Sequence, residues 1–160
     1  MTVMTGIAPI VQTVEVKAPP ERAFEAFTGS MGDWWPKGMT IGGSHHVAVV
    51  IEPRAGGRWF ERDAEGRETD WGRVLAWEPP GRLLLAWQIT SAWAFDPGFE
   101  TTVEMAFAPL PGGGTRVTLE HRDLERYGAD AAKHSEMLRG GWPKLMAGFA
   151  ALADGGSAPA

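Results

Sequence analysis

The 160-residue chain contains no cysteine. This absence excludes disulfides, thiolate nucleophiles and thiolate metal sites, and it is typical of a cytoplasmic protein. The chain also lacks a long apolar run: the longest, Leu83 to Trp87, is far shorter than the roughly 20 residues that a membrane-spanning helix needs. Because no basic segment followed by an apolar stretch opens the sequence, we expect no signal peptide.

Basic charge is also scarce, since the formal net charge is −5 and the Lys and Arg residues are dispersed. A nucleic-acid-binding protein would show a basic patch, and an anionic membrane would repel this chain. We therefore expect neither nucleic acid nor membrane as a partner. The adjacent His45 and His46 point apart on a strand, so we predict no metal site. The glycine pairs do not fit a phosphate-binding loop, and we predict no cofactor.

The hydrophobic fraction of 44% suits a folded globular protein, and the length suits one domain. We predict a single domain over residues 1–160, with a core at about 10–153 and flexible termini. Alternating apolar residues predict seven strands. They span about 10–17, 46–51, 58–62, 68–78, 83–90, 101–108 and 115–122.

Helical patterns flank these strands. Two short helices are predicted between the first two strands, ending near Gly29 and Pro36. The C-terminal segment predicts a long helix over about 130–153, because apolar residues recur every three or four positions. Pro143 and the preceding Gly140-Gly141 pair predict a kink or break there. The resulting fold class is α+β, with a curved seven-stranded antiparallel sheet around the long helix and space for a small ligand between them.

A series of short motifs in order along residues 10–153 resembles the activator-of-Hsp90-ATPase-homologue family, within the START-like (SRPBCC, Bet v 1-like) superfamily. The resemblance implies a helix-grip fold with a cavity between helix and sheet, and it supplies no catalytic residues. It raises an Hsp90-type chaperone as a partner, but the sequence shows no counterpart of the separate Hsp90-binding domain of the eukaryotic co-chaperone. The motifs include Ala18-Pro19-Pro20-Glu21-Arg22-Ala23-Phe24, Trp34-Trp35-Pro36, Pro53-Arg54-Ala55-Gly56-Gly57-Arg58-Trp59, Trp71-Gly72-Arg73-Val74, Pro79-Pro80-Gly81-Arg82-Leu83, Gly114-Thr115-Arg116-Val117-Thr118-Leu119-Glu120-His121 and Gly141-Trp142.

Eight tryptophans are the most unusual feature of the composition. Large aromatic side chains usually pack in a core, but several that share the inner face of a sheet can also wall a cavity. Strand alternation and helix spacing predict which residues face the space between helix and sheet. The candidate ligand-binding residues are Trp87, Met105, His121, Trp142 and Met146, with Trp71 and Trp35 as weaker additions.

His121 ends an otherwise apolar row, and two interpretations remain open. It is either a hydrogen-bonded core residue or the polar group that orients a ligand.

Three functional hypotheses follow from the sequence. The first is a non-enzymatic binder of a small hydrophobic or aromatic molecule, and the second is a cyclase- or hydratase-like enzyme that uses a pocket histidine as acid or base. The third is a protein-interaction module with an exposed apolar face. No nucleophile motif points to covalent catalysis.

Overall fold

The structure is a computed structural model, and it describes residues 7–155. The predicted flexible termini therefore lie largely outside the described residues. The elements are β1 (Ile10–Val16), α1 (Pro20–Gly29), α2 (Met31–Trp34), β2 (His46–Ile51), β3 (Arg58–Asp63), β4 (Glu68–Glu78), β5 (Arg82–Trp87), β6 (Thr101–Pro109), β7 (Thr115–Arg122), the 3-10 helix η1 (Leu124–Asp130) and α3 (Ala131–Ala153).

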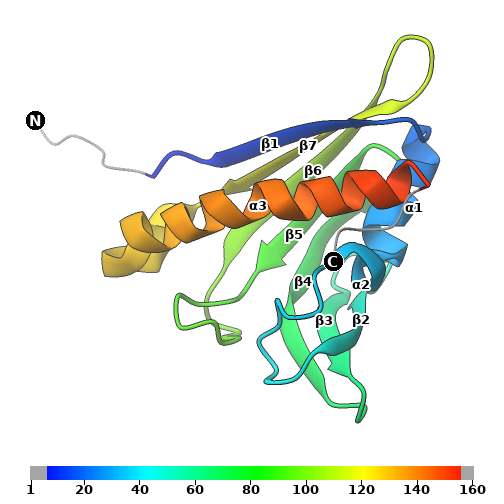
Figure 1. Ribbon diagram of the computed structural model, residues 1–160. Helices are drawn as coiled ribbons and strands as arrows, with labels where there is room; N and C mark the ends of the chain where they lie inside the picture. Colours follow the sequence, from blue (N-terminus) through cyan, green and yellow to red (C-terminus); the bar gives the residue numbers. More distant parts are fainter. Residues whose placement is uncertain (1–6, 156–160) are drawn as a thin grey trace, which may run out of the picture.

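All seven strands form one antiparallel sheet in the order β1-β7-β6-β5-β4-β3-β2. The first strand, β1, is an edge strand that pairs with the last strand, β7, with Ile10 opposite His121. Figure 1 shows α3 lying lengthwise across one face of this curved sheet, with α1 and α2 near its C-terminal end. The predicted α+β helix-grip architecture is confirmed, and the two short helices lie between β1 and β2 as expected.

Strand alternation decides which side chains face α3. Leu83 and Leu85 on β5, Met105 on β6 and Leu119 on β7 are fully buried beneath the helix side of the sheet. Their neighbours in sequence point to the opposite face. This continuous apolar layer meets the buried residues Leu138, Trp142, Leu145, Met146 and Phe149 of α3 and forms one core.

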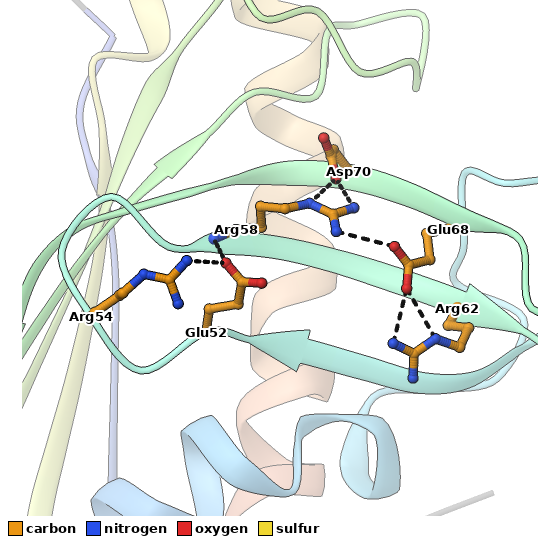
Figure 2. A network of polar contacts seen from close by, with 6 residues as sticks. All are labelled: Glu52, Arg54, Arg58, Arg62, Glu68 and Asp70. Atoms are coloured by element: carbon orange, nitrogen blue, oxygen red, sulfur yellow. Dashed lines mark hydrogen bonds and ion pairs between the residues drawn. The ribbon is translucent and has the colours of Figure 1, made fainter.

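The opposite face of the sheet carries paired charges. Figure 2 shows the part on β3 and β4, where Arg58 reaches Asp70 at 2.7 Å and Glu68 at 3.0 Å. Arg62 reaches the same Glu68 at 2.9 Å, and both arginines lie over the ring of Phe60. These cross-strand pairs hold the pKa of Glu68 below its usual value. The network keeps this face polar.

A regular strand would place Val47 on the same side as the buried Val49 and Ile51. Val47 is instead 57% exposed, because the register between β2 and β3 shifts between His46 and Ala48. Of the kink or break predicted in the C-terminal helix, the break does not occur: α3 runs from Ala131 to Ala153 with Pro143 inside it. The 3-10 helix η1, in which Gly128 has a φ of 67°, was not predicted.

Candidate functional site

A cavity of about 230 Å³ lies between α3, the inner face of the sheet and the segment that follows α2. Four buried indoles form its inner walls, from Trp35, from Trp71 on β4, from Trp87 on β5 and from Trp142 on α3. All four side chains are at most 5% exposed. The strands and the helix thus bring together residues that lie more than a hundred positions apart in sequence.

The four indoles contact one another edge to face or at a tilt. The ring centroids of Trp35 and Trp71 are 4.9 Å apart, and those of Trp87 and Trp142 are 5.8 Å apart. Trp59 packs behind this group, 5.6 Å from Trp71. Such geometries are the favourable ones for aromatic pairs. The wall is therefore a continuous aromatic surface that is fixed by its own packing.

Three of the four wall tryptophans donate their indole N–H groups to hydrogen bonds within the protein. Trp35 donates to the carbonyl oxygen of Met39 at 2.8 Å. Trp71 donates to Oε1 of Glu61 at 2.7 Å, and Trp142 donates to Nδ1 of His121 at 3.1 Å. Because these donors are satisfied, the rings present mainly apolar area to the cavity.

Glu61 is a buried carboxylate, 2% exposed, that organises two parts of the wall. Besides the Trp71 indole it accepts the backbone N–H of Ile41 at 2.8 Å and of Gly42 at 3.2 Å. Ile41 also lines the cavity. A Cβ at Gly42 would lie 2.9 Å from Oε2 of Glu61 and 2.7 Å from Oγ1 of Thr69, so a larger residue there would displace both side chains.

His46 holds the other end of the same segment. Its Nε2 lies 3.1 Å from the carbonyl oxygen of Trp35 and 3.2 Å from that of Pro36. Burial lowers the pKa of His46, and the nearby Lys37 charge lowers it further. A neutral imidazole therefore ties Trp35 to β2, while Glu61 ties Ile41 to β3 and β4.

The cavity opens to solvent through apolar side chains. Among the described residues, the exposed large hydrophobic side chains include Met39, Trp93 and Met137, which are 40–50% exposed and all line the cavity. Gly141 lies at the same opening, and a Cβ placed there would meet no atom within 4 Å. Exposed apolar residues thus gather around one entrance.

The sequence predicted part of this site. Trp35, Trp71, Trp87 and Trp142 lie together at the cavity, whereas Met105, His121 and Met146 are fully buried residues that do not line it. These three lie deeper in the core. The sequence pattern did not place the other lining residues at the cavity. They are Met39, Thr40, Ile41, Ile89 and Trp93 from loops, and Met137, Leu138, Gly141 and Leu145 from α3.

His121 has the geometry of a satisfied core residue. It is fully buried, accepts from Trp142, and its Nε2 lies 2.8 Å from the hydroxyl of Thr101. Burial lowers the pKa of His121 to about 3, with a smaller contribution from His134. The imidazole is therefore neutral at physiological pH, and both nitrogens are engaged by protein groups.

Two further kinds of site can be excluded for residues 7–155. No group of three or more His, Asp or Glu side chains is placed to hold a metal ion. No helix in this part of the chain combines the length and apolar character needed to cross a membrane.

A curved antiparallel sheet packed against a long C-terminal helix, with two short helices between the first two strands, defines a START-like helix-grip fold. The model of the "Activator of Hsp90 ATPase homolog 1-like protein" family matches residues 17–154, and the chain belongs to this family. A search of curated protein sequences finds no match.

Several solved structures are similar over most of the chain. The anthrahydroquino-γ-pyrone synthase Txn09, solved in complex with a ligand designated SUM, is 36% identical, with 92% of this chain and 98% of that chain covered and a TM-score of 0.64. The self-sacrificing resistance protein CalC from Micromonospora echinospora is 26% identical, with 92% and 94% covered and a TM-score of 0.66. An Aha1 dimer from Colwellia psychrerythraea is 13% identical, with 92% and 97% covered and a TM-score of 0.64, and shows the shared fold alone.

Proposed function

We propose that the protein binds a small hydrophobic or aromatic molecule in the cavity between α3 and the sheet. The observation that carries this proposal is the convergence of Trp35, Trp71, Trp87 and Trp142 on one cavity. Apolar pockets of this kind are typical of small-molecule sites. The exposed apolar residues around the entrance offer a path for an apolar ligand from solvent.

The cavity volume limits the size of the ligand part that it holds. An engineered apolar cavity of about 150 Å³ binds benzene, so about 230 Å³ suits a one- or two-ring aromatic group. The 36% identical anthrahydroquino-γ-pyrone synthase Txn09 is named for an aromatic product, which supports this class of ligand.

A pair of glycine variants tests binding. Gly141→Leu adds a side chain at the cavity, whereas Gly140→Leu adds the same side chain one position earlier on α3, outside the cavity lining. A leucine at 141 would take up cavity volume that the ligand needs, so Gly141→Leu is expected to weaken naphthalene binding about tenfold or more, which corresponds to about 1.4 kcal/mol. Isothermal titration calorimetry measures both dissociation constants. Equal affinity of the two variants, or no binding to the unaltered protein, contradicts the proposal.

A second candidate is an enzyme that closes a ring on the bound molecule. Its support is the 36% identity with a pyrone synthase over 92% of the chain. A direct test uses 1-(2-hydroxyphenyl)-3-phenylpropane-1,3-dione, whose phenol oxygen can attack the distal ketone and release water to give a γ-pyrone. An enzyme accelerates this closure over the buffer rate and loses the acceleration in Gly141→Leu. If the protein only binds the diketone, ring closure proceeds at the rate seen in buffer.

The interaction-module alternative has weaker structural support. The outer sheet face carries paired charges rather than an apolar surface, and the exposed apolar residues at the entrance belong to the cavity. An Hsp90-type partner therefore rests on the family relationship alone. A cytoplasmic location stays a prediction from the sequence.

A further inference from the structure

A second cavity of about 280 Å³ lies beside the first and shares two wall residues with it, Trp93 and Met137. Its remaining lining is polar, from Ser91 in the loop between β5 and β6 and from Asp130, Lys133 and His134 around the start of α3. Trp93 and Met137, both partly exposed, thus line an apolar chamber on one side and a polar chamber, open to solvent, on the other.

His134 lines this second chamber and carries a buried hydrogen-bonding atom that no group in the described part of the chain uses. The residue is 3% exposed, and its ring packs between Trp93, with centroids 4.8 Å apart, and Tyr127, at 4.4 Å. Its Nε2 is buried and has no hydrogen-bond partner among residues 7–155. Burial lowers the pKa of His134, so the ring is neutral. An unpaired buried polar atom is costly, and a ligand group that pairs with it would recover this cost.

The charges around His134 select the kind of group that fits. Asp130 carries a negative charge and already accepts a hydrogen bond from Ser91 at 2.8 Å, while Lys133 carries a positive charge. A ligand carboxylate would meet Asp130, and a ligand ammonium would meet Lys133. A hydroxyl group avoids both repulsions, because it donates to the carboxylate or imidazole and accepts from the ammonium.

We propose that one ligand occupies both chambers, with its aromatic body among the indoles and a hydroxyl group in the chamber of Asp130, Lys133 and His134. This inference rests on the proposed function and narrows the ligand class to hydroxylated aromatic molecules longer than the first cavity. Met137 is a flexible side chain that can move aside. The backbone of Trp93 is in the left-handed region, with a φ of 58°, and its backbone N–H donates to the carbonyl oxygen of Thr90 at 2.9 Å.

Two elongated probes of nearly equal shape test the second chamber. 4-Phenylphenol carries a terminal hydroxyl, and 4-methylbiphenyl carries a methyl group in its place. A purely apolar site prefers the methyl, because the hydroxyl must be desolvated without a partner. With one or two hydrogen bonds made in the polar chamber, the phenol is expected to bind about five- to tenfold more tightly. Displacement of a fluorescent apolar dye measures both affinities.

Variants locate the hydroxyl. His134→Phe keeps a ring between Trp93 and Tyr127 but removes the nitrogen, and Asp130→Asn removes the charge. Loss of the phenol preference in either variant supports the proposal. Glu136→Gln, on the exposed side of α3 and outside both linings, keeps the preference. Circular dichroism confirms that each variant is folded.

The outcomes separate the two proposals. If the unaltered protein binds both probes and prefers 4-methylbiphenyl, the second chamber takes no hydroxyl and this inference is wrong, while the apolar cavity stands. The same holds if the phenol preference survives in both His134→Phe and Asp130→Asn. If neither probe binds and naphthalene does not bind, the proposed function fails and this inference fails with it.

Discussion

The indole nitrogen of Trp142 on α3 donates to Nδ1 of His121 on β7 across 3.1 Å. Because Nδ1 accepts, the neutral imidazole carries its hydrogen on Nε2 and donates it to Oγ1 of Thr101 at 2.8 Å. This buried chain of hydrogen bonds ties the long helix to two strands of the sheet. It also fixes the plane of the Trp142 ring at the cavity, so His121 acts on the site through Trp142.

Replacement of Trp142 tests how much this contact stabilises the fold. Trp142→Ala removes a side chain that is 2% exposed and leaves His121 without its donor, so the free energy of unfolding is expected to fall by about 3–5 kcal/mol. Met137→Ala, half exposed on the same helix, is expected to cost less than about 1 kcal/mol. Urea denaturation measures both. Similar losses in the two variants would contradict the assigned helix face.

The stability of the protein should depend on pH through His121. Its folded pKa is about 3, below the unfolded value of 6.5, so the unfolded chain binds the proton first as the pH falls. This contribution is fully present above about pH 6.5 and is lost as the pH falls from there toward the folded pKa. Between about pH 6.5 and about pH 5, His121 alone is expected to remove about 2 kcal/mol of stability.

The variant His121→Gln isolates this contribution, because glutamine does not titrate. The pKa values of His46 and His134 are also lowered, so some pH dependence remains in the variant. We expect its unfolding free energy to change about 2 kcal/mol less than that of the unaltered protein over the same interval. Urea denaturation at the two pH values measures the difference. Parallel pH profiles for the two proteins would show that His121 is not buried and neutral.

Glu61 is expected to hold the loop wall of the cavity in place. Glu61→Gln retains the size of the side chain but replaces one acceptor oxygen by a donor, so it cannot accept all three N–H groups from Trp71, Ile41 and Gly42. We expect a loss of about 1–3 kcal/mol in stability and faster amide exchange at Ile41 and Gly42. Hydrogen exchange followed by NMR measures this effect at each amide.

The control for Glu61 is Glu68→Gln on the outer face, where the pairs with Arg58 and Arg62 are partly exposed. Surface pairs of this kind contribute about 0–1 kcal/mol, so exchange at Ile41 should stay unchanged. Unchanged exchange in Glu61→Gln as well would mean that the carboxylate does not hold this segment.

The continuous helix around Pro143 predicts a static wall. Proline removes the hydrogen bond to the carbonyl of Arg139, yet α3 continues through this position. We therefore expect slow amide exchange from Leu138 to Gly141 that naphthalene does not alter. Fast exchange in the free protein that slows when naphthalene binds would instead identify this segment as a gate.

The sequence predicted the sheet well because strand alternation and turn residues are local signals. The bounds of β4 and β7 agree with the expected ranges, and the inward rows on β5, β6 and β7 are those that the period of two indicates. A period of two does not describe Val47, because the register shift beside it changes which residues of β2 face inward. The turn of η1 carries no such periodic signal.

The sequence predicted only some of the residues that line the cavity, for a related reason. Alternation indicated the inner face but not where along that face the space lies, so Met105 and Met146 were placed on the wall although they are buried behind it. Ile41 and Trp93 reach the cavity from loops, where periodicity carries no information. The role of Glu61 depends on backbone N–H groups about twenty residues earlier, a contact that no local pattern in the sequence encodes.

The indole N–H resonances of the eight tryptophans offer the most direct test of the aromatic cavity. In a ¹H–¹⁵N titration with naphthalene, we expect the largest shifts at Trp35, Trp71, Trp87 and Trp142, because the ring current of the probe acts only over a few ångströms. Trp77, outside the cavity lining, is the internal control and should not shift. Saturable shifts at the four wall indoles are the result that this account predicts. Unchanged resonances at all four, or shifts at Trp77 alone, would contradict it.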